Sequence, residues 1–229
     1  MLRDPRKDEA YFEAYIEYQK KRINMFAQQL ELLEENVDAN RQKIALCSRY
    51  LTNFTADLFS AEYSYGCDIE TLKATFDQHV SYFQKNDTIT ISDTLFTFSV
   101  AIMFDMDCAG IINQSKVPDD AVSIELFRRG TKSIVSEDSL SESISDFMPA
   151  KFLMDSLQGN VTLAELKDYI ENRWYDDNGD AVWYDSHKSD SDTYCGYWCY
   201  IGAAIVKILG FDFTAFRGTA YFPYDLFTK

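Results

Sequence analysis

The sequence predicts an all-α protein, a compact multi-helix chain in which a long N-terminal helical hairpin packs against a helical C-terminal domain. Two observations predict this class. Apolar residues recur every three or four positions along several long stretches, which is the spacing of one helix face. Residues that favour helix starts stand before these stretches, and Gly210 follows the last of them, where a left-handed helix cap is expected.

The first two helices are expected to form an antiparallel hairpin. The first runs to about Glu35, with Asp8 as its cap, and has an apolar stripe of Phe12, Ile16, Ile23, Phe26, Leu30 and Leu33. A polar break follows at 36–40. A second stripe of the same spacing then comprises Ile44, Cys47, Leu51, Phe54 and Leu58. A hairpin is the most economical way for two long amphipathic helices to cover each other's stripes.

The apolar stretches in the middle of the chain predict three further helices. Asp68 is the expected cap of a helix that ends near Phe83. The stretch 89–106 is apolar on nearly all sides, and its length favours a buried central helix over a strand. A short helix is expected at 118–129, and the serine-rich, acidic run that follows Gly130 is either a loop or a short solvated helix.

The last third is expected to hold two helices separated by a polar loop. The first begins at Val161 and ends near Trp174, and the second runs from Thr193 to Leu209. We divide the chain into an N-terminal helical segment, 1–116, and a C-terminal helical segment, 117–229.

The net charge of −15 excludes some classes of partner. A nucleic-acid binder neutralises phosphates with lysine and arginine, whereas this chain has 37 acidic residues and 22 basic ones. Anionic membrane surfaces repel such a chain for the same reason. If charge selects a partner, that partner is basic. The alternative is that the charge serves only solubility.

The expected location is the cytoplasm. The first nine residues lack the apolar core of a signal peptide, and no apolar stretch is long enough to span a bilayer. Five cysteines, an odd number in a chain of this length, do not resemble a disulfide framework. They are expected to be reduced thiols.

The chain lacks a convincing catalytic set or metal site, so we predict no enzyme activity and no cofactor. Its two histidines are His79, which lies among apolar helix positions, and His187. One enzymatic alternative is a Cys–His hydrolase that uses Cys195 and His187, because a thiol near a helix start can be reactive. Papain-like enzymes place the histidine after the cysteine, and no histidine follows Cys199.

The strongest candidate binding region is the segment from Asp168 to Asp192. It holds eight acidic residues and two basic ones, interleaved with Trp174, Tyr175, Trp183 and Tyr184. Acids around aromatics suit a basic partner, since charge steers the encounter and aromatics anchor it. The alternative is a solvated loop whose aromatics turn inward. The candidate partner contacts are Asp176, Asp177, Asp180, Tyr184, Asp185, Asp190 and Asp192.

Several short motifs resemble one known family. In the C-terminal half they are Tyr184-x-Ser186-His187-Lys188, Tyr194-x-Gly196-Tyr197-Trp198, the run 203–210 and Tyr221-x-Pro223-Tyr224-Asp225. In the N-terminal half they are Arg3-Asp4-Pro5, Tyr11-Phe12, Tyr15-Ile16 and Tyr63-Ser64-Tyr65-Gly66 with Ile69-Glu70-x-Leu72. Together these residues resemble PoNi proteins, the immunity proteins for the PoNe family of polymorphic nuclease toxins.

The resemblance implies a helical, cytoplasmic antitoxin that binds a cognate basic DNase toxin and protects the producing cell in interbacterial competition. The net charge argues against a nucleic-acid or membrane partner, and the oligomeric state stays open. An acidic scaffold for another basic protein is the remaining alternative. The motif residues are expected to pack and not to touch the toxin. We assign this structural role to Trp183, His187, Tyr194, Gly196, Tyr197, Trp198, Pro223 and Tyr224.

Overall fold

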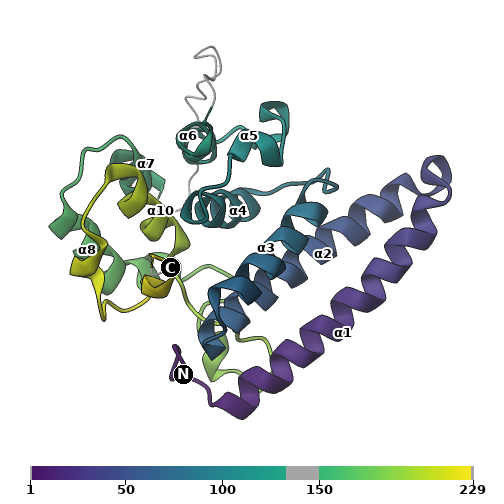
Figure 1. The fold of residues 1–229 in the computed structure, drawn as a ribbon, viewed down its shortest axis with the longest axis horizontal. Coiled ribbons are helices and arrows are strands. Elements are labelled where there is room, and N and C mark those ends of the chain that lie inside the picture. The colour runs from purple at the N-terminus through teal and green to yellow at the C-terminus, as the bar shows by residue number, and fades with distance from the viewer. Residues whose placement is uncertain (1, 133–149, 228–229) are drawn as a thin grey trace. The chain divides into compact units, whose positions relative to one another are not determined.

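The computed structural model describes residues 2–132 and 150–227, and the described residues form helices, turns and loops without any strand. This confirms the predicted all-α class. The chain forms two compact units (Figure 1). The first unit comprises Met1–Ile89 and Asp185–Gly196, and the second comprises Thr90–Tyr184 and Tyr197–Lys229. The sequence division at residue 116 stays a prediction.

The predicted hairpin is present in the first unit. α1 (Glu9–Glu34) and α2 (Val37–Tyr65) lie side by side in Figure 1. Asp8 caps α1 as expected, accepting a hydrogen bond from the Tyr11 amide at 2.8 Å. The polar break is shorter than predicted, because α2 already begins at Val37. The two stripes form one core of Ile23, Leu30, Cys47, Leu51, Phe54 and Leu58.

α3 (Ile69–Phe83) packs on α2 and completes the helical part of the first unit. Asp68 caps α3 through the Thr71 amide at 2.8 Å, as the sequence predicted. His79 is fully buried, and its ring stacks near Phe83 at 5.9 Å. Burial lowers the pKa of His79 to about 3, so this histidine is neutral and structural.

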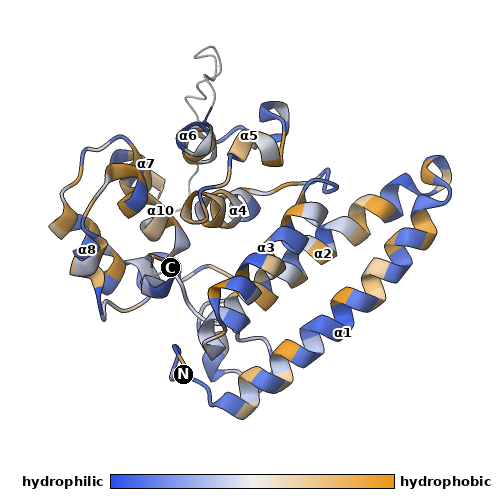
Figure 2. Ribbon diagram, in the orientation of Figure 1, coloured by the Kyte–Doolittle hydropathy of each residue, from blue (hydrophilic) through white to orange (hydrophobic). Residues whose placement is uncertain are grey.

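The second unit is built around α4 (Ile91–Met103), the buried central helix that the sequence predicted. α10 (Tyr200–Leu209) and α6 (Ala121–Gly130) both pack on α4. Figure 2 shows that α4 and α10 consist largely of hydrophobic residues. α5 (Cys108–Ile111) and the 3₁₀ turn Gln114–Lys116 precede α6.

Three further helices of the second unit lead towards the candidate site. α7 (Ala150–Leu157), which the sequence did not predict, packs on α6. α8 (Leu163–Asn172) has a complete capping box at Thr162, and α9 (Trp174–Asp177) follows directly. Short 3₁₀ turns close the chain at Phe213–Phe216 and Tyr224–Phe227. Most of the acidic run after Gly130 lies outside the described residues.

One helix prediction was wrong. The last long helix does not start at Thr193, because α10 begins only at Tyr200. Gly196 has a φ of +117°, which interrupts a right-handed helix and which a residue with a side chain rarely adopts. The predicted left-handed cap at Gly210 is confirmed by a φ of +65°. In the described part of the chain, no helix has the length and hydropathy needed to cross a bilayer.

Candidate partner-binding surface

The acidic segment from Asp168 to Asp192 is divided between the two compact units. Its part up to Tyr184 belongs to the second unit, and its part from Asp185 onward belongs to the first unit. The seven candidate partner contacts are therefore distributed over two surfaces, which we describe one at a time.

Six aromatic side chains of the second unit gather into one group, which we call the aromatic cluster: Trp174, Tyr175, Trp183, Tyr184, Tyr197 and Tyr221. The ring centroid of Tyr175 lies 4.5 Å from that of Tyr184 and 5.4 Å from that of Tyr221. Trp174 stacks on Trp183 at 5.4 Å. Aromatic pairs at these separations stabilise each other beyond their buried area.

The aromatic side chains of the segment differ in exposure. Trp174 is 7% exposed, so its ring belongs to the core. Tyr175, Trp183 and Tyr184 are only partly buried. The inward-turned interpretation therefore accounts for Trp174 and for the fully buried Tyr169, while the rings of Tyr175, Trp183 and Tyr184 remain within reach of a partner.

Three aspartates of this part, Asp176, Asp177 and Asp180, stand between the aromatic residues 174–175 and 183–184 in the sequence. Asp176 and Asp180 are exposed. Asp177 is partly buried and forms an ion pair with Arg173 at 3.6 Å, which offsets its charge. The Tyr184 hydroxyl lies 3.5 Å from Asp176 Oδ1, at the limit of a hydrogen bond. The negative charge that a partner would meet here comes mainly from Asp176 and Asp180.

The part of the segment in the first unit presents three more aspartates. Asp185 takes a left-handed backbone conformation with a φ of +57° and forms an ion pair with Lys188 at 2.9 Å. The 3₁₀ turn Ser186–Lys188 follows it. Asp190 and Asp192 are exposed. Because Lys188 offsets the charge of Asp185, the net negative charge of this stretch lies at the last two.

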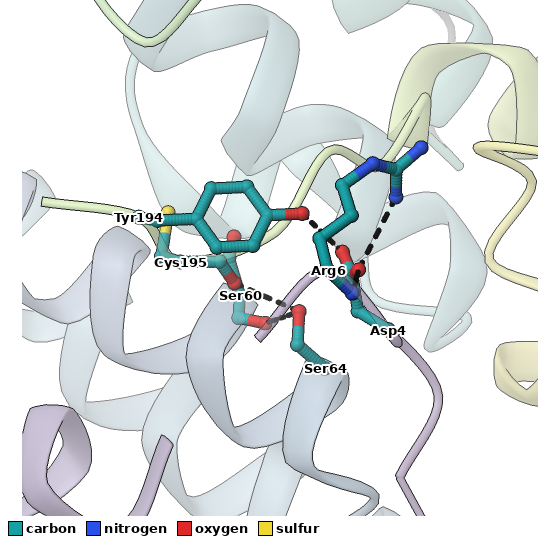
Figure 3. Close-up of polar contacts among 6 residues, drawn as sticks. All are labelled: Asp4, Arg6, Ser60, Ser64, Tyr194 and Cys195. Atoms are coloured by element: carbon teal, nitrogen blue, oxygen red, sulfur yellow. Dashed lines mark hydrogen bonds and ion pairs between the residues drawn. The ribbon is translucent and has the colours of Figure 1, made fainter. Parts of the chain in front are cut away.

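The family motifs of the first unit meet in a group that we call the motif cluster: Asp4, Arg6, Tyr11, Ser64, Tyr194 and Cys195. Figure 3 draws all of these except Tyr11. Asp4, Ser64 and Tyr194 are buried, and the other three are partly buried. Asp4 is fully buried and accepts a short hydrogen bond from the Tyr194 hydroxyl. It also accepts one from the Arg6 amide at 3.0 Å, and the Arg6 guanidinium lies 3.2 Å away. A buried carboxylate is tolerated because it is paired and hydrogen-bonded in this way.

The motif cluster joins segments that are up to 190 positions apart in the sequence. The Tyr11 hydroxyl donates to the Tyr194 carbonyl oxygen and accepts from the Tyr194 amide, both at 2.9 Å. Ser64 Oγ lies 2.8 Å from the carbonyl oxygens of Ser60 and Cys195. The backbone groups of Tyr194 and Cys195 thus bond to side chains of α1 and α2. In an α-helix the same backbone groups would bond to residues four positions away.

The other motif residues also have mostly interior positions. Tyr197 and Pro223 are buried, whereas Trp198 and Tyr224 are partly buried. The Cys199 amide donates to the Tyr221 carbonyl oxygen at 2.8 Å, and Arg217 Nη2 donates to the Tyr224 hydroxyl at 3.1 Å. These contacts hold chain segments together, which is what packing residues do.

The hydrolase alternative that used Cys195 and His187 is wrong. Burial raises the pKa of the Cys195 thiol well above its ordinary value, and the nearby Asp57 carboxylate raises it further. A reactive cysteine needs the opposite shift. Cys195 Sγ lies 4.0 Å from Asp57, and the His187 ring lies beside Tyr194 with centroids 6.0 Å apart. Among the described residues, no three His, Cys, Asp or Glu side chains gather as metal ligands would.

Sequence reasoning missed the convergence on Asp4. The signal was present in Arg3-Asp4-Pro5, where an aspartate stands before the first helix without being its cap. The spacing of apolar residues predicts which face of a helix is buried, but it predicts nothing about a polar residue outside a helix. The partner tyrosine lies far along the chain, so only the folded chain shows why an acid is needed there.

Comparison with known families gives two matches that together cover nearly the whole chain. Residues 3–111 match the family described as PoNe immunity protein (PoNi), N-terminal. Residues 120–226 match the family described as PoNe immunity proteins (PoNi), C-terminal. Searches among curated proteins and among solved structures found no significant match.

Proposed function

This chain belongs to the family of PoNe immunity proteins (PoNi), and we propose that it neutralises one cognate PoNe-type DNase toxin by binding it stoichiometrically. The observation that carries the proposal is the pair of family matches over both halves of the chain. An immunity protein of this kind is a binder, which agrees with the prediction that the chain is not an enzyme. Its proposed place of action is the cytoplasm, where the DNA of the producing cell would be attacked.

Electrostatics supports a basic partner. A DNase must carry positive charge where it holds the phosphate backbone. The chain has an excess of 15 negative charges, so opposite charges attract the two proteins before they touch. Complementary charge of this kind raises association rates more than it raises affinity, and fast capture limits damage to DNA.

The proposed contacts are the exposed members of the acidic segment. Asp176 and Asp180 beside the aromatic cluster form the contact surface of the second unit. Asp190 and Asp192 form the contact surface of the first unit. Asp177 and Asp185 contribute less, because each already faces a basic side chain. The partly exposed rings of Trp183 and Tyr184 can anchor a partner once charge has brought it close.

The test is titration of a nuclease assay. The purified toxin encoded next to this chain is incubated with plasmid DNA, and the chain is added in increasing molar ratio. The proposal predicts that cleavage falls linearly and stops near a one-to-one ratio, and that the two proteins co-purify. Cleavage that persists at a large excess of the chain would overturn the proposal. A non-cognate DNase is the control, and its activity should not change.

A different basic partner is the alternative that the same experiment separates. If the chain served as an acidic scaffold, it would bind the toxin weakly or bind unrelated basic proteins equally well. A basic protein without nuclease activity, tested at the same ionic strength, measures that non-specific attraction. Binding of the toxin should survive moderate salt, whereas binding driven by charge alone is screened.

A further inference from the structure

The α1–α2 hairpin carries an exposed apolar surface that its own core does not use. We call it the hairpin face and define it by Tyr18, Met25 and Leu32 on α1 and by Leu46 and Tyr50 on α2. These residues are between 40% and 67% exposed. In the described part of the chain, the only large exposed hydrophobics outside this face are Val37, which lies at the start of α2, and Val182.

Ring contacts show that the α1 and α2 parts of the face lie on the same side of the hairpin. The Arg22 guanidinium lies 5.2 Å from the centre of the Tyr18 ring and 3.6 Å from that of Phe54. Phe54 stacks on Tyr50 at 5.9 Å, and Tyr50 contacts Phe26 at 5.6 Å. Tyr18 and Tyr50 therefore lie on the same side of the hairpin, with the partly buried Arg22 and Phe26 between them. Figure 2 shows hydrophobic residues recurring along α1 up to the turn of the hairpin.

The spacing on α1 is that of a helix–helix seam. Tyr18, Met25 and Leu32 are seven positions apart, which is the heptad repeat of helices that pack at a shallow angle. α1 thus has two stripes, because another set of positions, including Ile23 and Leu30, faces α2. An exposed heptad stripe over about 21 Å of helix is suited to a second long helix.

Charge selects which partner covers the face. Residues 14–53 carry five acidic and six basic residues, whereas the remainder of the chain carries 32 and 16. A basic toxin gains no attraction at such a balanced surface. Two copies of an acidic chain, by contrast, repel each other least where their charge is balanced.

The order of charges along α1 is also self-complementary. Lys20, Lys21 and Arg22 precede Met25, and the acids Glu31, Glu34 and Glu35 follow it. In an antiparallel pair of α1 helices centred on Met25, the basic residues 20–22 of one copy lie at the level of residues 28–30 of the other, next to Glu31. Lys20 and Lys21 also pair with Glu62 and Glu17 of their own chain, so the partner's Glu31 would share them. If the two-fold axis passes near Met25, Tyr18 of one copy lies opposite Leu32 of its partner, because each is seven positions from Met25. A two-fold interface requires this self-complementarity.

We propose that the hairpin face is the interface of a symmetric homodimer, in which α1 packs antiparallel against α1 of a second copy. The interface joins two first units and leaves the acidic segment to the toxin. Tyrosine and methionine, which supply three of the five residues of the face, are enriched at protein interfaces. The proposal concerns the chain without its toxin, so it does not depend on the proposed function.

The experiment measures the mass of the chain alone in solution. Sedimentation velocity over a concentration series should show a monomer–dimer equilibrium for the unchanged chain. Met25→Glu places two like charges at the axis and should raise the dimer Kd by more than about tenfold. Val182→Glu is the matched control, because it makes the same change at an exposed valine of the second unit and should leave the Kd unchanged.

A cysteine pair tests the antiparallel geometry. Met25→Cys should form an intermolecular disulfide rapidly under mild oxidation, whereas Val182→Cys should not. A chain that stays monomeric at every concentration would overturn the proposal, as would a dimer that Met25→Glu leaves intact. If Met25→Glu instead weakens toxin binding while the mass of the free chain is unaffected, the face belongs to the toxin and the homodimer is wrong.

Discussion

The motif cluster and the aromatic cluster both contain family motif residues, yet they present opposite properties to solvent. In the motif cluster the carboxylate of Asp4 is fully buried and accepts hydrogen bonds from Tyr194 and Arg6. Around the aromatic cluster the carboxylates of Asp176 and Asp180 are exposed. An acid in the first place holds the fold, and an acid in the second is available to a partner.

This difference separates two kinds of sequence constraint. The Asp4–Tyr194 pair joins distant segments, so changing either member affects folding before it affects binding. Asp176 and Asp180 can change with little cost in stability, since exposed charges contribute little to it. A family can therefore keep one fold while its exposed acids adapt to different toxins.

Tyr194→Phe should destabilise the chain by about 2–3 kcal/mol, because a buried carboxylate loses its hydroxyl donor. The free energy of unfolding, measured with urea, checks this. Tyr184→Phe is the matched control from the aromatic cluster. Its hydroxyl lies 3.5 Å from an exposed carboxylate, so the change should cost less than about 0.5 kcal/mol. An equal loss of unfolding free energy in the two variants would show that the Tyr194 hydroxyl stabilises the fold no more than the Tyr184 hydroxyl does.

Asp57→Asn should stabilise the chain relative to the unchanged chain, by an amount that grows as the pH rises. Burial raises the pKa of Asp57 from 3.8 to about 7, against the lowering effect of Arg22. The folded state holds this proton between those two values, so the stability it provides is complete below pH 3.8 and is lost as the pH rises through 7. The asparagine cannot ionise.

The gain in free energy of unfolding from Asp57→Asn, relative to the unchanged chain, should be about 3 kcal/mol larger at pH 8 than at pH 4.5. Urea denaturation at the two pH values measures it. The opposite pH dependence of the buried His79 is common to both proteins and cancels in the comparison. A gain that is the same at both values would show that Asp57 is ionised normally in the folded chain.

Local patterns predicted the helices and their caps, and non-local contacts explain the failures. Asp8 and Asp68 were identified as caps because the capping residue and its helix are adjacent in sequence. The start of α10 was misplaced because residues 194–196 are hydrogen-bonded to α1 and α2, which no local pattern reveals. For the same reason the sequence did not show that the acidic segment changes unit after Tyr184.

Neutralising the exposed acids should slow toxin capture without affecting the fold. The double variants Asp176→Asn with Asp180→Asn, and Asp190→Asn with Asp192→Asn, should each lower the association rate by roughly three- to tenfold at low salt. Stopped-flow or surface plasmon resonance measures this rate. Glu70→Gln with Asp77→Asn removes the same charge from exposed positions on α3 and is the control. An equal slowing by the control would mean that only net charge matters.

Cys195→Ser should have the smallest effect. The thiol does not take part in chemistry, so the variant should protect DNA at the same molar ratio as the unchanged chain. Its free energy of unfolding should change by less than about 1 kcal/mol. The nuclease titration described above measures protection. Loss of protection by a stably folded Cys195→Ser chain would restore the enzymatic alternative.

Amide hydrogen exchange of the chain with and without its toxin tests the separation of roles most directly. Peptides that cover 174–192 should exchange more slowly in the complex, because they contain the exposed acids and the partly exposed rings. Peptides that cover 3–12 and 60–66 should keep the same exchange, since Asp4, Phe12 and Ser64 are already buried in the chain alone. Toxin-dependent slowing confined to the peptides of the motif cluster, with 174–192 unchanged, would contradict the account.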